Sequence, residues 1–199
     1  MTVRNRRSRC FQALIKQTAV DVNAQDSDGD SALHLAAQCE ANDYVWRLCH
    51  LRGARVNALN KNHSSALHLA CRETRTGAIT TLLQHGADLS ITDGSGNTVL
   101  HIASRFGHAD IIKHLLLFMP IAIVNMRNNV GQTALHVAVA HRQAASVALL
   151  TSHATCDVIA QDANHRTALR TLVMVYEPGT HDSSCADVDS CSCCGCFTG

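Results

Sequence analysis

Apolar and polar positions recur in blocks along almost the whole chain. One block, residues 94–103, reads Gly-Ser-Gly-Asn-Thr-Val-Leu-His-Ile-Ala. Related blocks contain His34, His68 and His136, so that four histidines stand 33 to 35 residues apart, and a decayed copy has Arg170 at the next such position. A fixed period of this length predicts a stack of small units, each burying its apolar face against its neighbours.

A second apolar segment with helical spacing follows each block. In the first unit the pattern predicts an inner helix over residues 31–38 and an outer helix over residues 43–51. Gly53 then supplies the left-handed position that ends a helix. Trp46, the only tryptophan, shares the outer helix with apolar residues, and we expect it to pack.

The block resembles the signature of the ankyrin repeat, Thr-Pro-Leu-His-x-Ala, which opens the first of two antiparallel helices. Four copies keep the Thr or Ser, the Leu, the His and the Ala, and all five have Ala or Val in place of Pro. The connector at residues 86–89, Gly-Ala-Asp-Leu, is similar to the Gly-Ala-Asp-Val of the family. The resemblance covers residues 10–177 and implies an all-α solenoid of helix-turn-helix units with β-hairpin fingers.

Three regions are expected along the chain. Residues 1–25 form an N-terminal half-repeat that caps the stack and contains a short amphipathic helix over residues 10–17. Residues 26–178 are ankyrin repeats, divided into 26–59, 60–92, 93–127, 128–161 and a partial unit at 162–178. Residues 179–199 form a flexible, Cys-rich tail, because so few apolar groups cannot offset the entropy of ordering.

Three departures from the family pattern stand out. Residues 118–124, Phe-Met-Pro-Ile-Ala-Ile-Val, lengthen a connector that begins His-Gly-Ala in the family. The helix before them should stop near Phe118, and the extra apolar groups either pack into the stack, which we favour, or form a contact patch. Arg142 occupies a turn position that is usually Gly, so that turn is built differently or costs more. The last unit lacks an outer helix, which leaves an inner helix uncovered.

Composition excludes several classes of protein. Seventeen basic and sixteen acidic side chains leave a formal charge of +1, which argues against nucleic-acid binding. The longest apolar run, residues 115–124, is too short to cross a bilayer, and the N-terminus lacks the apolar stretch of a secretory signal. We therefore expect a cytoplasmic or nuclear protein. Four arginines within residues 4–9 form either a nuclear-import patch or, as we favour, a solvated basic end.

The scattered cysteines fit small buried side chains in a reducing compartment better than disulfides. They are Cys10, Cys39, Cys49, Cys71 and Cys156.

No pattern of a catalytic or cofactor site is found. The family resemblance gives His34, His68, His101 and His136 a structural role: each ring bonds the hydroxyl three residues earlier and bridges to the backbone of the adjoining unit. A nucleophile elbow, a phosphate-binding Gly-x-x-x-x-Gly-Lys loop and a His-Glu-x-x-His helix are all absent from the sequence. We predict a protein that is not an enzyme and needs no cofactor or metal in its repeats.

The tail carries the one cluster that the repeats do not explain, Cys191, Cys193, Cys194 and Cys196. Three interpretations stay open: an inert tail, acylation that would anchor the protein to a membrane, and ligation of a soft metal. Membrane association is expected only if these cysteines are acylated.

The predicted function is to bind another protein, as an adaptor or an inhibitor, through the hairpin tips and the concave face of the inner helices. The tip candidates are Asp28, Asp30, Lys61, Asn62, His63, Asn97, Asn129, Gln132, Asn164 and Arg166. The concave-face candidates are Gln38, Glu40, Arg72, Glu73, Arg105, His141 and Arg142.

Two alternatives refine this function. Ankyrin proteins of this size include IkappaB-like inhibitors of Rel-type transcription factors, although their Asp-Ser-Gly-x-x-Ser degradation signal is absent here. A start and a stop inside repeats instead favour a truncated regulatory arm of a larger enzyme or channel.

Overall fold

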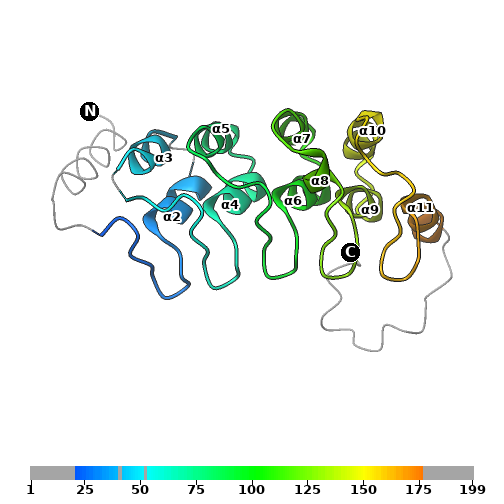
Figure 1. Ribbon diagram of the computed structural model, residues 1–199, viewed down its shortest axis with the longest axis horizontal. Coiled ribbons are helices and arrows are strands. Elements are labelled where there is room, and N and C mark those ends of the chain that lie inside the picture. The colour runs from blue at the N-terminus through cyan, green and yellow to red at the C-terminus, as the bar shows by residue number, and fades with distance from the viewer. Residues whose placement is uncertain (1–20, 40–41, 52, 177–199) are drawn as a thin grey trace, which may run out of the picture.

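The chain forms a curved row of two-helix units in a computed structural model, which describes residues 21–39, 42–51 and 53–176 (Figure 1). The inner layer consists of α2 (Ala32–Gln38), α4 (Ala66–Arg72), α6 (Val99–Phe106), α9 (Ala134–Ala140) and α11 (Ala168–Tyr176). The outer layer consists of α3 (Asn42–Cys49), α5 (Thr76–Gln84), α7 (Ala109–Leu116) and α10 (Ala144–Ser152). A single turn, α8 (Ile121–Val124), lies in the connection after α7. The predicted solenoid is therefore confirmed.

The core repeats with the sequence. The signature leucines, such as Leu67 and Leu100, are almost fully buried, and an outer-helix leucine such as Leu82 packs with them. Alanines that follow the signature histidine by two residues, such as Ala70 and Ala103, are fully buried, and their small side chains let neighbouring helices approach closely. Replacing one of these leucines by Ala would cost about 2–5 kcal/mol, because neighbouring units cannot close over the cavity.

A finger projects before each inner helix, and each finger is a hairpin closed by backbone hydrogen bonds. In the third finger the N–H of Asp93 donates to the carbonyl of Asn97, and the N–H of Gly96 donates back to the carbonyl of Asp93, both at 2.9 Å. Among the described residues, β-pairing is limited to two isolated bridges, Gln25 with Ser31 and Gln161 with Thr167.

The long connector after α7 divides between packing and exposure. α7 ends at Leu116, and Met119 and Val124 turn inward and are buried. Leu117, Phe118 and Ile121 remain largely exposed. The expectation that this apolar segment packs is therefore correct for only part of it.

The turns between inner and outer helices keep one backbone geometry even without glycine. Gly107 has a φ of 74°, and Arg142 adopts nearly the same conformation at 56°, as does Thr74. The turn at Arg142 is thus not rebuilt; it keeps a left-handed conformation that disfavours a residue with a Cβ.

Trp46 does not pack into the stack as predicted. Val45 and Leu48 face the core, whereas the Trp46 side chain is 52% exposed and lies on the ring of His50 with centroids 4.0 Å apart. One residue is a rotation of 100° around a helix, so the neighbour of a buried residue can face solvent.

The cysteine prediction holds fully only for Cys71. It is buried, Cys49 and Cys156 are partly buried, and Cys39 is exposed. Cys10, the helix predicted over residues 10–17, the rest of the N-terminal cap before residue 21, Glu40 and the tail lie outside the described residues.

Candidate functional site

The signature histidines join each unit to the next. In the first full unit the hydroxyl oxygen of Ser31 accepts the backbone N–H of His34, and the hydroxyl donates to Nδ1 of His34 over 2.8 Å. The opposite ring nitrogen, Nε2, donates to the carbonyl of Ser64 in the next unit at 3.1 Å. The same pattern recurs at His68, His101 and His136, each 1% exposed, with Nε2 distances of 3.2, 3.0 and 2.9 Å to the next carbonyl.

This geometry requires a neutral imidazole. A backbone N–H also donates to Nδ1 in every case, as Thr98 does to His101 at 3.2 Å, so Nδ1 must act as an acceptor and the proton sits on Nε2. Burial lowers the pKa of His68 and of His101 below the ordinary value of 6.5. These rings therefore act as fixed cross-links and leave no free nitrogen for catalysis.

A second set of residues, absent from the sequence prediction, shapes the fingers. Asp93 Oδ1 accepts the backbone N–H groups of Ser95 and Asn97 at 2.9 and 2.8 Å. An Asp or Asn makes this pair of contacts in all five fingers: Asp26, Asn60, Asp93, Asn128 and Asp162. The available signal was an Asp or Asn five residues before every helix-capping Ser or Thr.

The fingers also bind one another near their tips. The N–H of Lys61 donates to the carbonyl of Asp28 at 3.1 Å, and Gly94 donates to Asn62 at 2.9 Å. Because the backbone N of Asn129 would lie only 2.7 Å from a Cβ on Gly96, which has a φ of 76°, that glycine is required by both space and conformation. The five fingers are consequently linked in a row, and their exposed side chains are held in fixed relative positions.

Some tip candidates take part in this framework. Asn128 Nδ2 donates to Asn97 Oδ1 at 3.0 Å, and Asn129 Nδ2 donates to the carbonyl of Gly94 at 3.2 Å. The Arg166 guanidinium forms an ion pair with the Asp162 carboxylate at 3.0 Å. Burial alone would raise the pKa of the Asp162 carboxyl, but hydrogen bonds from Arg166 lower it. These side chains therefore help to hold the fingers together, and their polar groups are already used in contacts within the protein.

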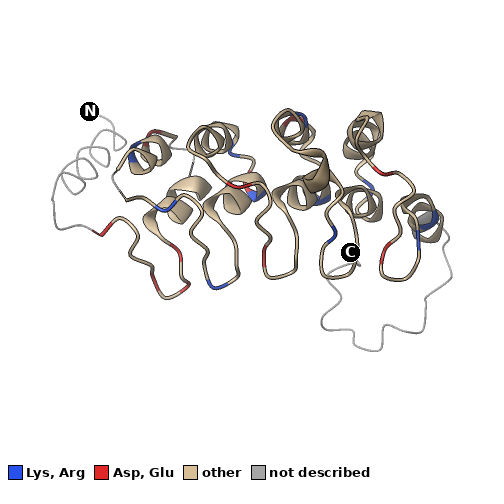
Figure 2. Ribbon diagram, viewed as in Figure 1, with Lys and Arg blue, Asp and Glu red and all other residues tan. Residues whose placement is uncertain are grey.

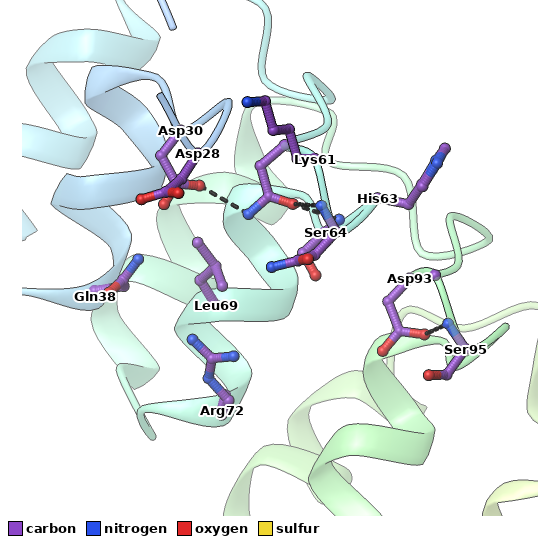
Figure 3. A pocket seen from close by; sticks show the side chains of 13 residues that line it. Asp28, Asp30, Gln38, Lys61, His63, Ser64, Leu69, Arg72, Asp93 and Ser95 are labelled. Carbon is purple, nitrogen blue, oxygen red and sulfur yellow. Dashed lines mark hydrogen bonds between the residues drawn. The ribbon is translucent and has the colours of Figure 1, made fainter. Parts of the chain in front are cut away.

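Other candidates come together in one groove of about 630 Å³, which lies across the first three fingers and α4 (Figure 3). Seven predicted residues line it: Asp28, Asp30, Gln38, Lys61, Asn62, His63 and Arg72. Six residues outside the prediction complete the lining: Asn60, Ser64, Leu69, Asp93, Gly94 and Ser95. Leu69 is the one apolar side chain among them, and it is almost buried.

Charges in the groove are largely uncompensated. Within the described part of the chain, neither the carboxylate of Asp28 nor the amine of Lys61 has a hydrogen-bond or ion-pair partner. Figure 2 shows a basic position at the tip of the second finger, beside acidic positions on the first. Asp30 accepts one hydrogen bond, from Asn60 Nδ2 at 2.8 Å. Among the described residues, Arg72 forms an ion pair with Glu73 alone, at 3.6 Å, and both side chains are well exposed, so this pair contributes little to stability.

Comparison with known proteins decides the family. The model of ankyrin repeats (three copies) matches residues 1–93 and 78–162. The chain is an ankyrin-repeat protein. Ankyrin repeats are protein-interaction modules.

Known ankyrin-containing proteins resemble the chain over most of its length. It is 35% identical over 144 residues to the nuclear factor NF-kappa-B p105 subunit of Rattus norvegicus, covering 69% of this chain and 15% of that protein. The Gallus gallus p105 subunit is 30% identical over 156 residues, which is 75% of this chain and 16% of that protein. The putative ankyrin repeat protein FPV031 of Fowlpox virus (strain NVSL) is 34% identical over 148 residues, or 70% of this chain and 42% of the viral protein. The chain thus spans less than half the length of these relatives.

The remaining candidates lie farther along the same ankyrin surface. Arg105 is partly buried beside the Phe106 ring, and burial, followed by the charge of Arg105, lowers the pKa of His141. Arg142 is exposed in its left-handed turn. Gln132 contributes its carbonyl to His101, and Asn164 is exposed on the fifth finger.

Neither a cluster of metal ligands nor a membrane-spanning helix occurs in the described part of the ankyrin array. In residues 21–39, 42–51 and 53–176, no three His, Cys, Asp or Glu side chains are grouped to hold a metal ion. None of the helices in these ranges has the length and hydropathy needed to cross a bilayer. Cys191, Cys193, Cys194 and Cys196 lie beyond them, so acylation or metal binding of the tail stays a prediction.

Proposed function

We propose that this ankyrin array is a non-catalytic module, an adaptor or an inhibitor, that holds a partner protein against the groove and the neighbouring inner-helix ends. The observation that carries the proposal is that the side chains that hold the fold together differ from those that project charge into the groove. Buried histidines and turn-closing Asp and Asn residues hold the frame, while Asp28, Lys61 and Arg72 project charges that the frame does not use.

The surface outside the groove extends the same face. Arg72 and Arg105 lie in the last turns of α4 and α6, and Arg142 follows α9. Cations near helix C-termini interact favourably with the helix dipole, so these positions keep positive charge on the inner-helix ends at little cost. A partner that lies along this row would meet a basic edge and, at the first finger, an acidic one.

The experiment reverses the charge of Arg72, Arg105 and Arg142 together, by Arg→Glu, in the full chain. Affinity capture should lose the partner that the unaltered protein retains, while circular dichroism shows that the helical array is still folded. A small fall in the midpoint of thermal unfolding is expected, because the reversed charges interact unfavourably with the helix dipoles. Lys113→Glu, a reversal on the exposed side of α7, is the matched control and should keep the partner. Undiminished capture by the triple variant would exclude this face.

A second candidate is inhibition of a Rel-type transcription factor. It is supported by the similarity to the NF-kappa-B p105 subunit over 69% of the chain. Purified Rel-domain protein should then be retained by the full chain and released by the triple variant. Absence of retention at micromolar concentrations would remove this candidate and leave the general proposal standing.

A further inference from the structure

We infer that the groove takes an extended, polar peptide segment of a partner, with a basic residue against Asp28 and Asp30 and an acidic residue against Arg72. The inference rests on the proposed function and specifies the chemistry of the bound segment. It starts from the composition of the groove wall. An amphipathic helix docks by placing apolar anchors in apolar pockets, whereas this wall offers one nearly buried leucine and otherwise hydrogen-bonding or charged groups.

The Asp28 and Asp30 carboxylates and the Arg72 guanidinium lie at separate ends of the groove, while Lys61 lies near the acidic pair and Asp93 lies on the third finger. In Figure 3, Asp28 and Asp30 lie together on the first finger, Arg72 lies at the opposite end on α4, and Leu69 lies between them. A segment with a single charge sign would be repelled at one end. One that carries a cation and an anion, spaced to reach both ends, satisfies both, and it can bind in only one direction.

The acidic end is prepared for a cation. Asp30 is held in place by Asn60, whose own Oδ1 closes the second finger, and Asp28 is fixed through its backbone by Lys61. The Asp30 carboxylate is therefore held in position by a neutral amide, and neither carboxylate forms an ion pair among the described residues. Preorganised acceptors lose little entropy when a guanidinium or ammonium group binds.

The middle of the groove suits a peptide backbone. The Gln38 side-chain amide and the Ser64 hydroxyl line it, and no side-chain hydrogen bond of either is formed within the described ranges. An amide supplies a donor and an acceptor, and a hydroxyl supplies both as well. Such groups can pair with the N–H and C=O of an extended chain whatever its sequence, which leaves specificity to the charged ends.

The test is selection of peptides from a random phage-displayed library on the full chain. We expect the enriched peptides to share one Lys or Arg and one Asp or Glu at a constant spacing, and their affinity to fall as salt is raised. Asp28→Lys should weaken a selected peptide about tenfold or more, and changing the basic residue of that peptide to Glu should restore binding. Arg72→Glu should likewise be rescued by a peptide whose acidic residue is changed to Lys.

The controls separate this inference from the proposed function. Asp110→Lys and Lys113→Glu reverse exposed charges on α7, outside the groove, and should leave peptide affinity unchanged. Loss of binding in the groove variants without rescue by the charge-reversed peptides would overturn the charge assignment and keep the groove as the binding site. Apolar consensus peptides, or failure to enrich any peptide, would overturn the extended polar segment. Peptides that bind every groove variant equally would refute both proposals.

Discussion

At the scale of single residues, one imidazole both caps a helix and hydrogen-bonds to the backbone of the next repeat. Each signature histidine combines a local hydrogen bond to Ser or Thr with a long-range bond to a carbonyl about 30 residues later. A buried ring that satisfies both nitrogens stabilises the stack, and losing it leaves a buried carbonyl without its donor. Stability should therefore depend on the protonation state of these rings.

Lowering the pH should destabilise the array before its carboxylates titrate. Because the folded pKa values of His68 and His101 lie below 6.5, folding favours their neutral form, and their contribution is complete above pH 6.5. It is lost as the pH falls from 6.5 toward the lowered folded values. Thermal midpoints measured from pH 7.5 down to about 5 should decline, and a flat profile would contradict the neutral assignment.

Three residue-scale features differ in how readily sequence predicts them. The histidine contacts could be anticipated from the family signature, because residue type and spacing suffice. The Asp and Asn that close the fingers were equally regular but went unnoticed, since turn residues are common in any exposed loop. Trp46 could not be placed, because the direction it faces depends on how α3 is rotated against α2 and α5.

At the scale of elements, two turns between paired helices hold non-glycine residues in a left-handed conformation. The turn after α4 places Thr74 at a φ of 56°, a conformation that is especially unfavourable for a β-branched residue. Repeat three has Gly107 at the same point. The fold thus imposes its geometry on sequences that do not favour it.

Thr74→Gly should therefore stabilise the protein by about 1 kcal/mol, since the relief of left-handed strain exceeds the added entropy of glycine in the unfolded chain. Denaturant unfolding measures the change. Thr76→Gly, at the first position of α5, is the matched control and should destabilise instead. A loss of stability in Thr74→Gly would show that the turn is not strained.

Predictions made from sequence were best for helices and weakest for connections. In the first unit the apolar period located both helices within two residues, with 31–38 predicted for α2 and 43–51 for α3, because each helix buries one repeating face. It could not say which groups of the segment after α7 turn inward, because α8 and the burial of Met119 depend on neighbouring units. The groove was anticipated only in part. Five of its six unpredicted lining residues lie on the second and third fingers, and the way these fingers face the groove depends on hydrogen bonds between neighbouring fingers.

At the scale of the whole molecule, the array is a one-dimensional stack in which every unit depends on its neighbours. α6 lies between α4 and α9, whereas α11 packs mainly on α9 among the described helices, and its Leu169, Val173 and Met174 are exposed (Figure 1). Units at the end of a solenoid have fewer interfaces and open at lower free energy.

Hydrogen exchange should report this gradient. Backbone amides of α11 should exchange faster than those of α6, whose Val99, Leu100 and Ala103 are fully buried. Equal protection of both helices would mean that another part of the chain, or a second copy, covers the α11 face.

The central claim is that the frame and the recognition surface use different side chains. The most direct measurement compares the free energies of unfolding of two variants of the full chain, Asp28→Lys/Arg72→Glu in the groove and His101→Ala in the frame. We predict that the groove variant stays within about 1 kcal/mol of the unaltered protein, which is the cost of one reversed charge at a helix end, while His101→Ala loses about 2–4 kcal/mol. A groove variant as unstable as His101→Ala would contradict it, because the groove charges would then be part of what holds the stack together.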